Sequence, residues 1–366
     1  MRRIFFCSFV SFLLISPVWT SPVFQKGMSY PAWSWNVLSL TKSSQSIAAM
    51  REIGVEWAAL CVFWFQDNEN SSVITEDPNR YSASRPSTVK AIADLHAAGI
   101  KVLLKPMVGL RNGEWCGTIK PSDAWFDAYE AYIADWAKFA ADNGVEIFCI
   151  GCEFVEAARY KTWAPYWRRI ADSVRAVYPG PITYASNHGN EQNIYWWDAV
   201  DYIGIDAYYA LSSQDNPTLA ELTSAWKKQA DKIESWRNRV WPDRPVLFTE
   251  IGYRSFDGAS RQPWDWQQDD PAKVDLQEQV DCYSAALEVL TARDWFYGFY
   301  WWNWETNPNA GGPSDTGYTP QNKPVQALLS DWYRNRLMGG RFSGIPSEFF
   351  YEPAQKQRTG GGKGKG

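Results

Sequence analysis

The segment FAADNG at residues 139–144, followed directly by VEIFCIGCE at residues 145–153, decides the fold. Its first half is helix-like and ends at Gly144. Glycine adopts the left-handed conformation that closes a helix without a steric penalty, after which the chain can turn sharply into a strand. The second half is a short apolar run that is typical of a buried strand, and it ends in Glu153.

The same transition recurs at three other places. Helix-like segments end at Gly54, Gly99 and Gly180, and an apolar run follows each one. With Gly144 included, successive transitions are 45, 45 and 36 residues apart, which fits β-α units better than hairpins. We predict strands near residues 28–33, 55–64, 100–107, 145–152, 181–186, 201–207, 245–250 and 297–302. We predict helices at about 42–53, 86–98, 122–142, 160–177, 218–238, 272–292 and 321–336, with a short one near 191–199.

Eight such units predict a closed (β/α)8 TIM barrel, an α/β fold, formed as a single domain by residues 27–336. An open doubly wound sheet is the alternative, but no G-x-G-x-x-G motif follows a predicted strand. The predicted helix-to-strand turns are short, whereas the strand-to-helix loops are long. The longest cover residues 66–85, 108–121, 251–271 and 303–320. In a barrel these loops form the face that carries the active site.

The composition favours a protein that contacts carbohydrate. The chain has 22 Trp, 19 Tyr and 18 Phe among its 366 residues. Trp and Tyr combine an apolar body with a polar edge, which suits half-wet recognition surfaces. The 36 basic and 41 acidic residues form no long run of either sign within the predicted barrel. A nucleic-acid partner is therefore not expected.

Both ends of the chain are predicted to lie outside the barrel. Arg2 and Arg3 precede the apolar run IFFCSFVSFLLI at residues 4–15. This pattern predicts a signal peptide over residues 1–21 and export to the periplasm or the cell exterior, with an uncleaved anchor as the alternative. No later segment is long and apolar enough to predict a membrane helix. Residues 337–366 form a C-terminal extension with a flexible tail that ends in GGGKGKG, and we expect a monomer.

The cysteines and histidines give no signal for a metal site or a cofactor. Six cysteines are present, and removal of residues 1–21 leaves five, so at least one thiol of a monomer is unpaired. There are only two histidines, and Cys149 and Cys152 have no second pair of ligands nearby. We therefore expect neither a metal nor a cofactor.

Two glutamates stand where predicted strands end. Glu153 follows the fourth strand, and Glu250 ends the apolar run RPVLFTE at residues 244–250, the seventh strand. In a barrel both side chains would open onto the same face. Glycosidic bond cleavage requires a pair of carboxyl groups, and aromatic rings can stack on sugar faces. The alternative is that either acid caps a helix or pairs with a surface cation. We favour catalysis because both acids follow deeply apolar strands in an aromatic-rich chain.

Several motifs in order along the chain resemble glycoside hydrolase family 113. They are LLKPMV at 103–108, IGCEF at 150–154, ITYASN at 182–187, DYIGIDAYY at 201–209, VLFTEIGYRS at 246–255 and YWWNW at 300–304. The resemblance covers most of residues 27–336, and its most specific parts are TEIGYRS and WWNW. It implies a retaining (β/α)8 hydrolase of a β-linked polysaccharide, with β-1,4-mannan as the first expectation. It also implies that Glu153 is the acid/base and Glu250 the nucleophile.

Other outcomes stay open at this point. The substrate could be another β-glycan, the action could be exo rather than endo, or the chain could be a non-catalytic carbohydrate-binding barrel. Cys152 departs from the wider clan, in which Asn commonly precedes the acid and contacts the sugar 2-hydroxyl. A thiol is a weak donor and does not replace an amide.

Further residues are candidates for substrate binding. Lys105 ends the third strand, and a buried lysine requires a partner such as a carboxylate or a sugar hydroxyl; the alternative is a structural salt bridge. Tyr208 is expected to hydrogen-bond Glu250, or to be a core residue. Trp302 is expected to form the floor of a sugar subsite, or to pack in the core. The remaining candidates are Asn187 for sugar hydroxyls, Trp35 and Trp64 as stacking platforms with Trp33 beside them, and Asp206 as an internal hydrogen-bonding carboxylate.

Overall fold

A computed structural model describes residues 24–267 and 270–336 of the chain. These residues form one closed barrel of eight parallel strands in the order β1-β2-β3-β4-β5-β6-β7-β8. The strands are β1 (Gln25–Pro31), β2 (Trp57–Gln66), β3 (Lys101–Leu110), β4 (Ile147–Cys152), β5 (Ile182–Asn187), β6 (Tyr202–Asp206), β7 (Val246–Ile251) and β8 (Phe296–Trp301). The predicted (β/α)8 fold is therefore confirmed. The predicted signal peptide (1–21) and C-terminal extension (337–366) lie outside the described residues.

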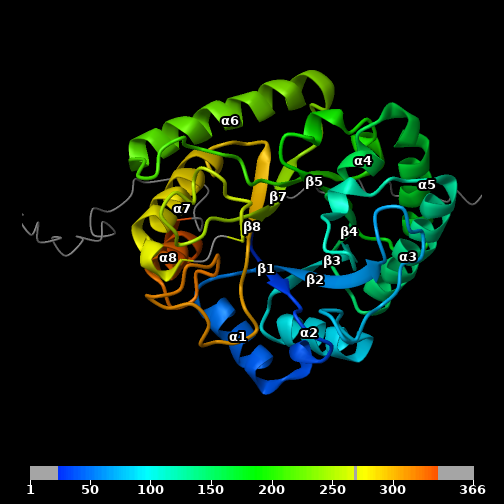
Figure 1. Ribbon diagram of the computed structural model, residues 1–366, viewed down its shortest axis with the longest axis horizontal. Coiled ribbons are helices and arrows are strands. Elements are labelled where there is room, and N and C mark those ends of the chain that lie inside the picture. The colour runs from blue at the N-terminus through cyan, green and yellow to red at the C-terminus, as the bar shows by residue number, and fades with distance from the viewer. Residues whose placement is uncertain (1–23, 268–269, 337–366) are drawn as a thin grey trace, which may run out of the picture.

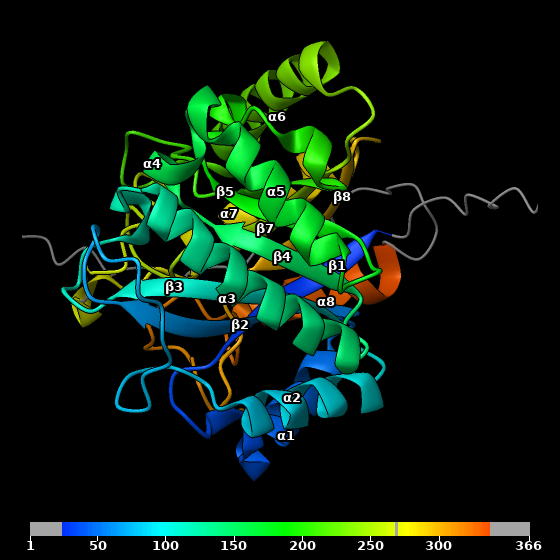
Figure 2. The ribbon, with the colours of Figure 1, turned by 90° about the vertical axis from the view of Figure 1, so that its right-hand side faces the viewer.

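Helices surround the barrel in Figure 1, and Figure 2 shows α3 and α5 lying across the outer side of the strands. The helices are α1 (Thr41–Glu52), α2 (Arg85–Ala97), α3 (Asp123–Asp142), α4 (Val155–Ala158), α5 (Ala164–Arg175), α6 (Leu219–Val240), α7 (Leu276–Leu290) and α8 (Pro324–Asp331). Among the described residues, no helix is both long enough and apolar enough to cross a bilayer.

Three predicted helices differ in detail from the structure. The helix predicted at 160–177 begins only at Ala164, because Pro165 sits in its first turn, where its missing N–H is not required. The helix predicted at 321–336 is shorter and continues as a π-helical turn over Trp332–Arg336. The short helix predicted near 191–199 is two separate 3-10 turns, Glu191–Asn193 and Trp197–Ala199.

Strand β2 shows how the sequence fills the barrel. Side chains alternate across a strand, so every second residue faces the barrel axis. Trp57 and Ala59 pack with residues of β3, β4 and β8 in one interior layer. Nearer the carboxyl end, Cys61, Phe63 and Phe65 form another cluster, against which Trp302 packs. Layers of this kind fill the interior of the barrel below the carboxyl ends of the strands.

Tryptophan serves mainly to pack the helices onto the barrel. Nine of the 22 tryptophans are among the largest fully buried side chains of the described residues. Trp167 and Trp196, for example, stack with ring centroids 4.7 Å apart. The tryptophan content that suggested a carbohydrate surface is thus largely a property of the core. Fewer tryptophans, among them Trp33 and Trp302, lie near the carboxyl ends of the strands.

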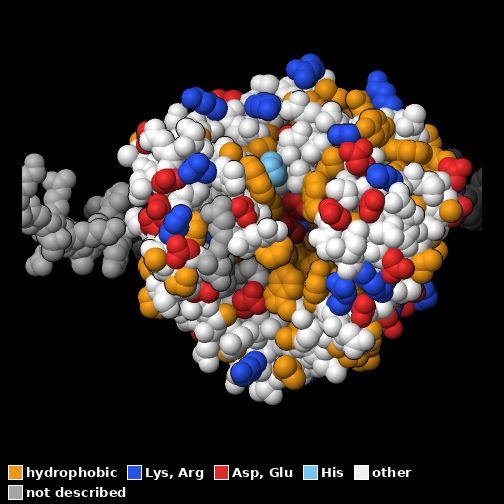
Figure 3. Space-filling view, viewed as in Figure 1, with side chains coloured by type: hydrophobic (Ala, Val, Ile, Leu, Met, Phe, Trp, Pro, Cys, Tyr) orange, Lys and Arg blue, Asp and Glu red, His pale blue; other side chains and the backbone are white. Residues whose placement is uncertain are grey.

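The carboxyl ends of the strands open onto a hollow face. Figure 3 shows a depression over the middle of the barrel, with acidic side chains in its depth and hydrophobic side chains around it. Long loops surround this face: β2 ends at Gln66 and α2 starts at Arg85, and β7 ends at Ile251 and α7 starts at Leu276. The loop asymmetry predicted from the sequence is therefore present.

Candidate active site

Glu153 is held in a special backbone conformation directly after β4. Its φ is +55°, in the left-handed region that costs energy for a residue with a Cβ atom. The Glu153 amide donates to the Ala185 carbonyl of β5 at 2.8 Å. The chain therefore turns at this residue while it stays attached to the sheet. Both carboxylate oxygens accept hydrogen bonds: Asn187 Nδ2 donates to Oε1 and Trp115 Nε1 to Oε2, each at 2.9 Å.

Glu250 lies within the end of β7 and is 5% exposed. Lys105 Nζ, from β3, donates to its Oε1 at 2.6 Å. The Tyr208 hydroxyl donates to its Oε2 at 2.8 Å. Both oxygens are therefore occupied by donors, one of them cationic, so the side chain is fixed and its ionised form is stabilised. The hydrogen bond from Tyr208 that was expected from the sequence is present.

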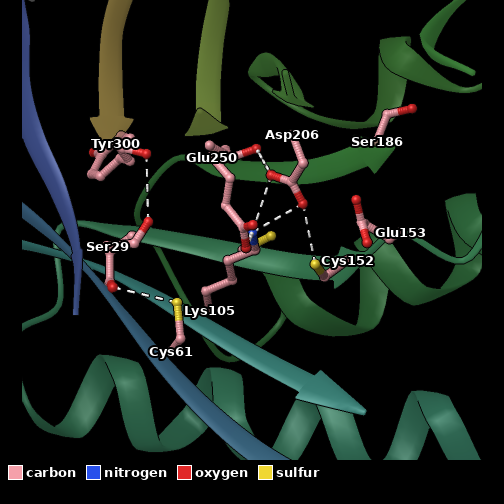
Figure 4. Close-up of polar contacts among 12 residues, drawn as sticks. Ser29, Cys61, Lys105, Cys152, Glu153, Ser186, Asp206, Glu250 and Tyr300 are labelled. Atoms are coloured by element: carbon pink, nitrogen blue, oxygen red, sulfur yellow. Dashed lines mark hydrogen bonds and ion pairs between the residues drawn. The ribbon is translucent and has the colours of Figure 1, made fainter. Parts of the chain in front are cut away.

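Lys105 also contacts the fully buried carboxylate of Asp206 at the end of β6, as Figure 4 shows. The Lys105 ammonium donates to Oδ1 and Oδ2 of Asp206, both at 3.1 Å. Thr249 Oγ1 donates to Oδ1 at 2.8 Å, and Cys152 Sγ donates to Oδ2 at 3.3 Å. Asp206 is thus the internal hydrogen-bonding carboxylate that was predicted, and a carboxylate is the partner that the buried Lys105 required.

The two glutamates differ in their electrostatic surroundings. Burial raises the pKa of Glu153, and the charge of Glu250 adds to the rise, while its two hydrogen-bond donors are neutral groups that oppose it. Burial and then Asp206 raise the pKa of Glu250 to about 7, against the opposing effect of Lys105 and Tyr208. Burial alone would lower the pKa of Lys105, but the surrounding acidic groups raise it well above its ordinary value. Lys105 therefore stays charged beside Glu250. Neither of the hydrogen bonds to Glu153 comes from a cation.

An aromatic cluster forms the wall on the side of β8, β1 and β2. Trp302, directly after β8, meets the Trp33 ring edge to face at 6.0 Å between centroids. Trp33 stacks on Phe63 at 5.7 Å, and Tyr81 contacts both of these rings. Trp33 is 40% exposed, and its Nε1 donates to Glu305 Oε1 at 3.3 Å. A partly exposed cluster with a polar edge fits the flat faces and hydroxyl groups of a sugar.

Of the two predicted platforms, Trp64 lies away from this wall. Trp64 lies on the opposite face of β2 from Phe63 and packs against Tyr132 and Trp136 of α3. Its predicted role as a platform is wrong because the period-two alternation of the strand directs it to the helix layer. Trp35 is half-buried, and its carbonyl accepts the Ser84 amide hydrogen bond at 2.8 Å. The ring contact with Trp302 comes from Trp33, two residues earlier.

Asn187 ends β5 and His188 follows it, and their side chains have different surroundings. The Asn187 side-chain amide was expected to bind sugar hydroxyls, and here it donates to Glu153. His188 stacks on Trp264 at 5.2 Å between centroids, and burial lowers its pKa to about 4. A neutral imidazole covered by a tryptophan is a structural or binding group, in agreement with the absence of a serine or cysteine nucleophile motif.

Trp115 donates a hydrogen bond to Glu153, and the sequence analysis did not single it out. It lies in the loop between β3 and α3 and is 45% exposed. One tryptophan in a loop, 38 positions from Glu153, carries no pattern that would mark it. The predicted long loop at 108–121 was the one available indication, since such loops form the active face of a barrel.

Two groups of side chains among the described residues have the composition of a cation site. Cys152, Asp206 and Glu250 form one, and Asp257, Asp275 and Glu278 the other. In the first, the Lys105 ammonium already bonds to both carboxylates. In the second, the Glu278 oxygens accept the amide hydrogens of Gly258 and Ser260. The five cysteines of the described residues, Cys61, Cys116, Cys149, Cys152 and Cys282, are all free thiols.

Comparison with known proteins gives one consistent result. The model of the family described as Glycoside Hydrolase Family 113 matches residues 32–323. The solved β-mannanase AaManA of that family, from Alicyclobacillus acidocaldarius in complex with ManMIm, is 27% identical with a TM-score of 0.74. That match covers 85% of this chain and 97% of the other.

A further solved structure, a complex of a β-1,4-mannanase of the same family, is 27% identical with a TM-score of 0.75. It covers 86% of this chain and 100% of the other. A β-D-glucuronidase from Dictyoglomus thermophilum, 16% identical with a TM-score of 0.57, covers 86% of this chain and 51% of the other and shares the fold alone. None of the curated proteins compared with the chain matches it.

Proposed function

The chain belongs to glycoside hydrolase family 113, and we propose that it hydrolyses β-1,4-linked mannan with retention at the anomeric carbon. It is a glycosidase, which removes the alternative of a non-catalytic sugar-binding barrel. The substrate follows from the solved relatives, which are β-1,4-mannanases that this chain matches over 85% or more of its length. The observation that carries the mechanism is the pair Glu153 and Glu250, presented at the carboxyl ends of β4 and β7 with different partners.

Glu250 is proposed as the nucleophile. Lys105 and Tyr208 stabilise its carboxylate, and attack by one oxygen on the anomeric carbon forms a covalent glycosyl-enzyme. Glu153 is proposed as the acid/base, because both of its hydrogen-bond donors are neutral groups, whereas Glu250 bonds to the Lys105 ammonium, which favours an ionised carboxylate. Glu153 gives that proton to the leaving glycosidic oxygen. It then takes a proton from the water that attacks the anomeric carbon and releases Glu250.

The substrate lies between the two glutamates with a defined direction. The leaving sugar has to lie on the side of Glu153, because the acid protonates the oxygen that departs. The sugar attacked by Glu250 then extends towards β8 and β1, where Trp302 and Trp33 form the aromatic wall. Retention predicts that the two carboxyl groups are about 5–5.5 Å apart, against about 6.5–9.5 Å for inversion.

Export of the enzyme remains part of the proposal. Arg2, Arg3 and the apolar run at 4–15 support a signal peptide, and a polysaccharide too large to enter a cell is met outside the cytoplasm. Cell fractionation with a C-terminal epitope tag tests this: the mature protein should be found outside the cytoplasm and should lack residues 1–21. Full-length protein in the cytoplasm would contradict export.

The activity is tested by reducing-sugar release from β-1,4-mannan and from β-1,4-glucan, with wild type and Glu250→Ala. We expect release from mannan by the wild type and a loss of about four orders of magnitude or more in the variant, as is typical when a nucleophile is removed. Glu76→Ala, an exposed acid in the loop after β2, is the matched control. Release from glucan alone would refute the substrate, and release that survives Glu250→Ala would refute the nucleophile. Proton NMR of the first-formed anomer tests retention.

A further inference from the structure

We propose that Trp115 is a positioning residue for Glu153, which holds the acid/base in place and stabilises the carboxylate that forms when it gives up its proton. This inference rests on the proposed function, because it deepens the role of Glu153 in that reaction. The geometry of the loop between β3 and α3 carries the inference.

Trp115 reaches Glu153 with the single polar atom of its ring. Its Nε1 donates to Oε2 of Glu153 at 2.9 Å, while Asn187 Nδ2 donates to Oε1 at the same distance. An indole N–H can only donate, so in this contact Trp115 is the donor and the Glu153 oxygen is the acceptor. The carboxyl group is therefore held from two sides, by one donor of β5 and one of the β3–α3 loop. Figure 4 shows Glu153 beside the Lys105 network but not joined to it.

The loop is built to keep the indole in this position. Trp115 precedes a 3-10 turn over Cys116–Thr118, and Thr118 Oγ1 donates to the Trp115 carbonyl at 2.8 Å. Cys116 Sγ contacts the Cys152 carbonyl at 3.8 Å, which ties the turn to the residue that precedes Glu153. Gly117 lies directly against the ring, since a Cβ atom there would be 2.4 Å from two of the Trp115 ring carbons. Glycine at 117 is thus required by the ring, and its φ is not in the left-handed region.

The hydrogen bond from Trp115 becomes stronger as the reaction proceeds. Glu153 begins neutral and becomes negatively charged when the leaving oxygen takes its proton. Hydrogen bonds to a charged acceptor are shorter and stronger than those to a neutral one. An interaction that is stronger in the transition state than in the ground state lowers the barrier. A substrate whose leaving group departs without a proton would gain nothing from Trp115.

Removal of the indole N–H has a defined effect on the pH profile. The Trp115 bond opposes the rise in the pKa of Glu153, so its loss moves that pKa further up. Glu153 works as an acid in its protonated form, and activity falls as pH rises through its pKa. The alkaline limb of kcat/KM therefore moves to higher pH. The titratable or charged groups that act electrostatically with Glu153 are Glu250, Asp206, Lys105, Cys116 and Cys152.

The test compares Trp115→Phe with wild type on two substrates. One is mannotetraose, whose leaving group requires a proton, and the other is 2,4-dinitrophenyl β-mannobioside, whose phenolate does not. A hydrogen bond to a charged group contributes about 1.5–3 kcal/mol, so kcat/KM on mannotetraose should fall about ten- to a hundredfold. On the aryl substrate it should change by less than about threefold. The alkaline limb measured on mannotetraose should move up in pH.

Gly117→Ala provides the second variant, because it keeps Trp115 but displaces its ring. It should reproduce the selective loss on mannotetraose with a folded protein, as judged by circular dichroism. Trp241→Phe is the matched control: this ring lies at the end of α6, directly before β7 and thus at the amino end of the barrel. It should change neither the ratio of kcat/KM on the two substrates nor the pH profile.

Equal losses on both substrates in Trp115→Phe, or an unchanged ratio and alkaline limb, would overturn the positioning role. Failure of the proposed function looks different, because wild type would then not cleave mannotetraose. In that case the same comparison is made on the β-glucan oligomer and its aryl glycoside. A wild type that cleaves neither β-glycan would overturn both proposals.

Discussion

At Lys105, one ammonium group contacts two buried carboxylates, Asp206 and Glu250, within 3.1 Å. Breaking such a buried network by removing one partner leaves the remaining charges uncompensated, and this is costly. The network has a functional reading as well. Lys105 keeps the pKa of Glu250 lower than burial and Asp206 alone would set it. A nucleophile has to be ionised, so the lysine acts on the acid limb of the activity profile.

Lys105→Met tests this at the residue scale. Without the ammonium the pKa of Glu250 rises. Activity requires ionised Glu250 and is lost as pH falls through this pKa. In the variant the loss therefore begins at a higher pH. The acid limb of kcat/KM on mannotetraose should therefore move up, and activity at pH 6 should fall about a hundredfold or more, as when one catalytic electrostatic partner is removed. The measurement is the pH profile, with melting curves to show that the variant is folded. An acid limb that stays in place would contradict the role of Lys105.

The elements show why identical residue types have different fates. In β2, Phe63 faces the barrel and contacts Trp33, whereas Trp64 faces α3. The ring of Trp64 also lies near the Arg85 guanidinium, 6.0 Å from its carbon. Phe63 and Trp64 are adjacent in the chain, yet one lies in the aromatic wall and the other packs against the helices. Trp302 and Trp64 therefore form a matched pair of tryptophans with different functions.

Trp64→Ala should destabilise the protein by about 2–4 kcal/mol, because it removes a large ring packed between strand and helix. Its kcat/KM on mannotetraose should stay within about twofold of wild type. Trp302→Ala should show the reverse pattern, with a fall in kcat/KM of at least tenfold. Urea unfolding and steady-state kinetics on both variants measure the two quantities. A loss of kcat/KM in Trp64→Ala without loss of stability would show that Trp64 contacts substrate after all.

For the whole molecule, closure of the barrel depends on the contact between the first and last strands. β1 pairs with β8 in parallel, with Gly27 opposite Tyr300. A Cβ atom at Gly27 would lie 2.5 Å from the Phe299 carbonyl oxygen, so only glycine permits this approach. The Tyr300 hydroxyl donates to Gln25 Oε1 at 2.6 Å and ties the same strands inside the barrel. Glu153 and Glu250, at the carboxyl ends of β4 and β7, belong to the sheet that this junction closes.

Gly27→Ala should lower the free energy of unfolding by about 1–3 kcal/mol, the usual cost of an extra methyl in a fully packed site. Tyr300→Phe, which removes only the hydroxyl group, should cost about 1 kcal/mol. Urea unfolding followed by tryptophan fluorescence measures both values. A neutral Gly27→Ala would mean that the junction can open to accept the methyl group without cost.

The periodic features of the chain were sufficient to predict the architecture. Four apolar runs follow a helix-ending glycine, and four more alternate with helix-like segments, so the pattern predicts eight buried strands and a closed barrel. Position at a strand end was likewise sufficient to bring Glu153, Glu250 and Tyr208 to one face. Lys105, expected to end the third strand, lies in the middle of β3 and reaches the same face from the barrel interior. These predictions depend on short-range physics, namely helix termination, strand alternation and burial, which act over a few neighbouring residues.

The tertiary structure alone decided which side chains meet at that face. Trp115 reaches Glu153 from a loop without regular structure, and Trp33 rather than Trp35 contacts Trp302. The sequence pattern could not separate Trp64 from a cleft residue, because the choice depends on which face of β2 the barrel encloses. Contacts of this kind join residues tens or hundreds of positions apart. They depend on loop paths and on barrel closure, and local sequence preferences carry no information about either.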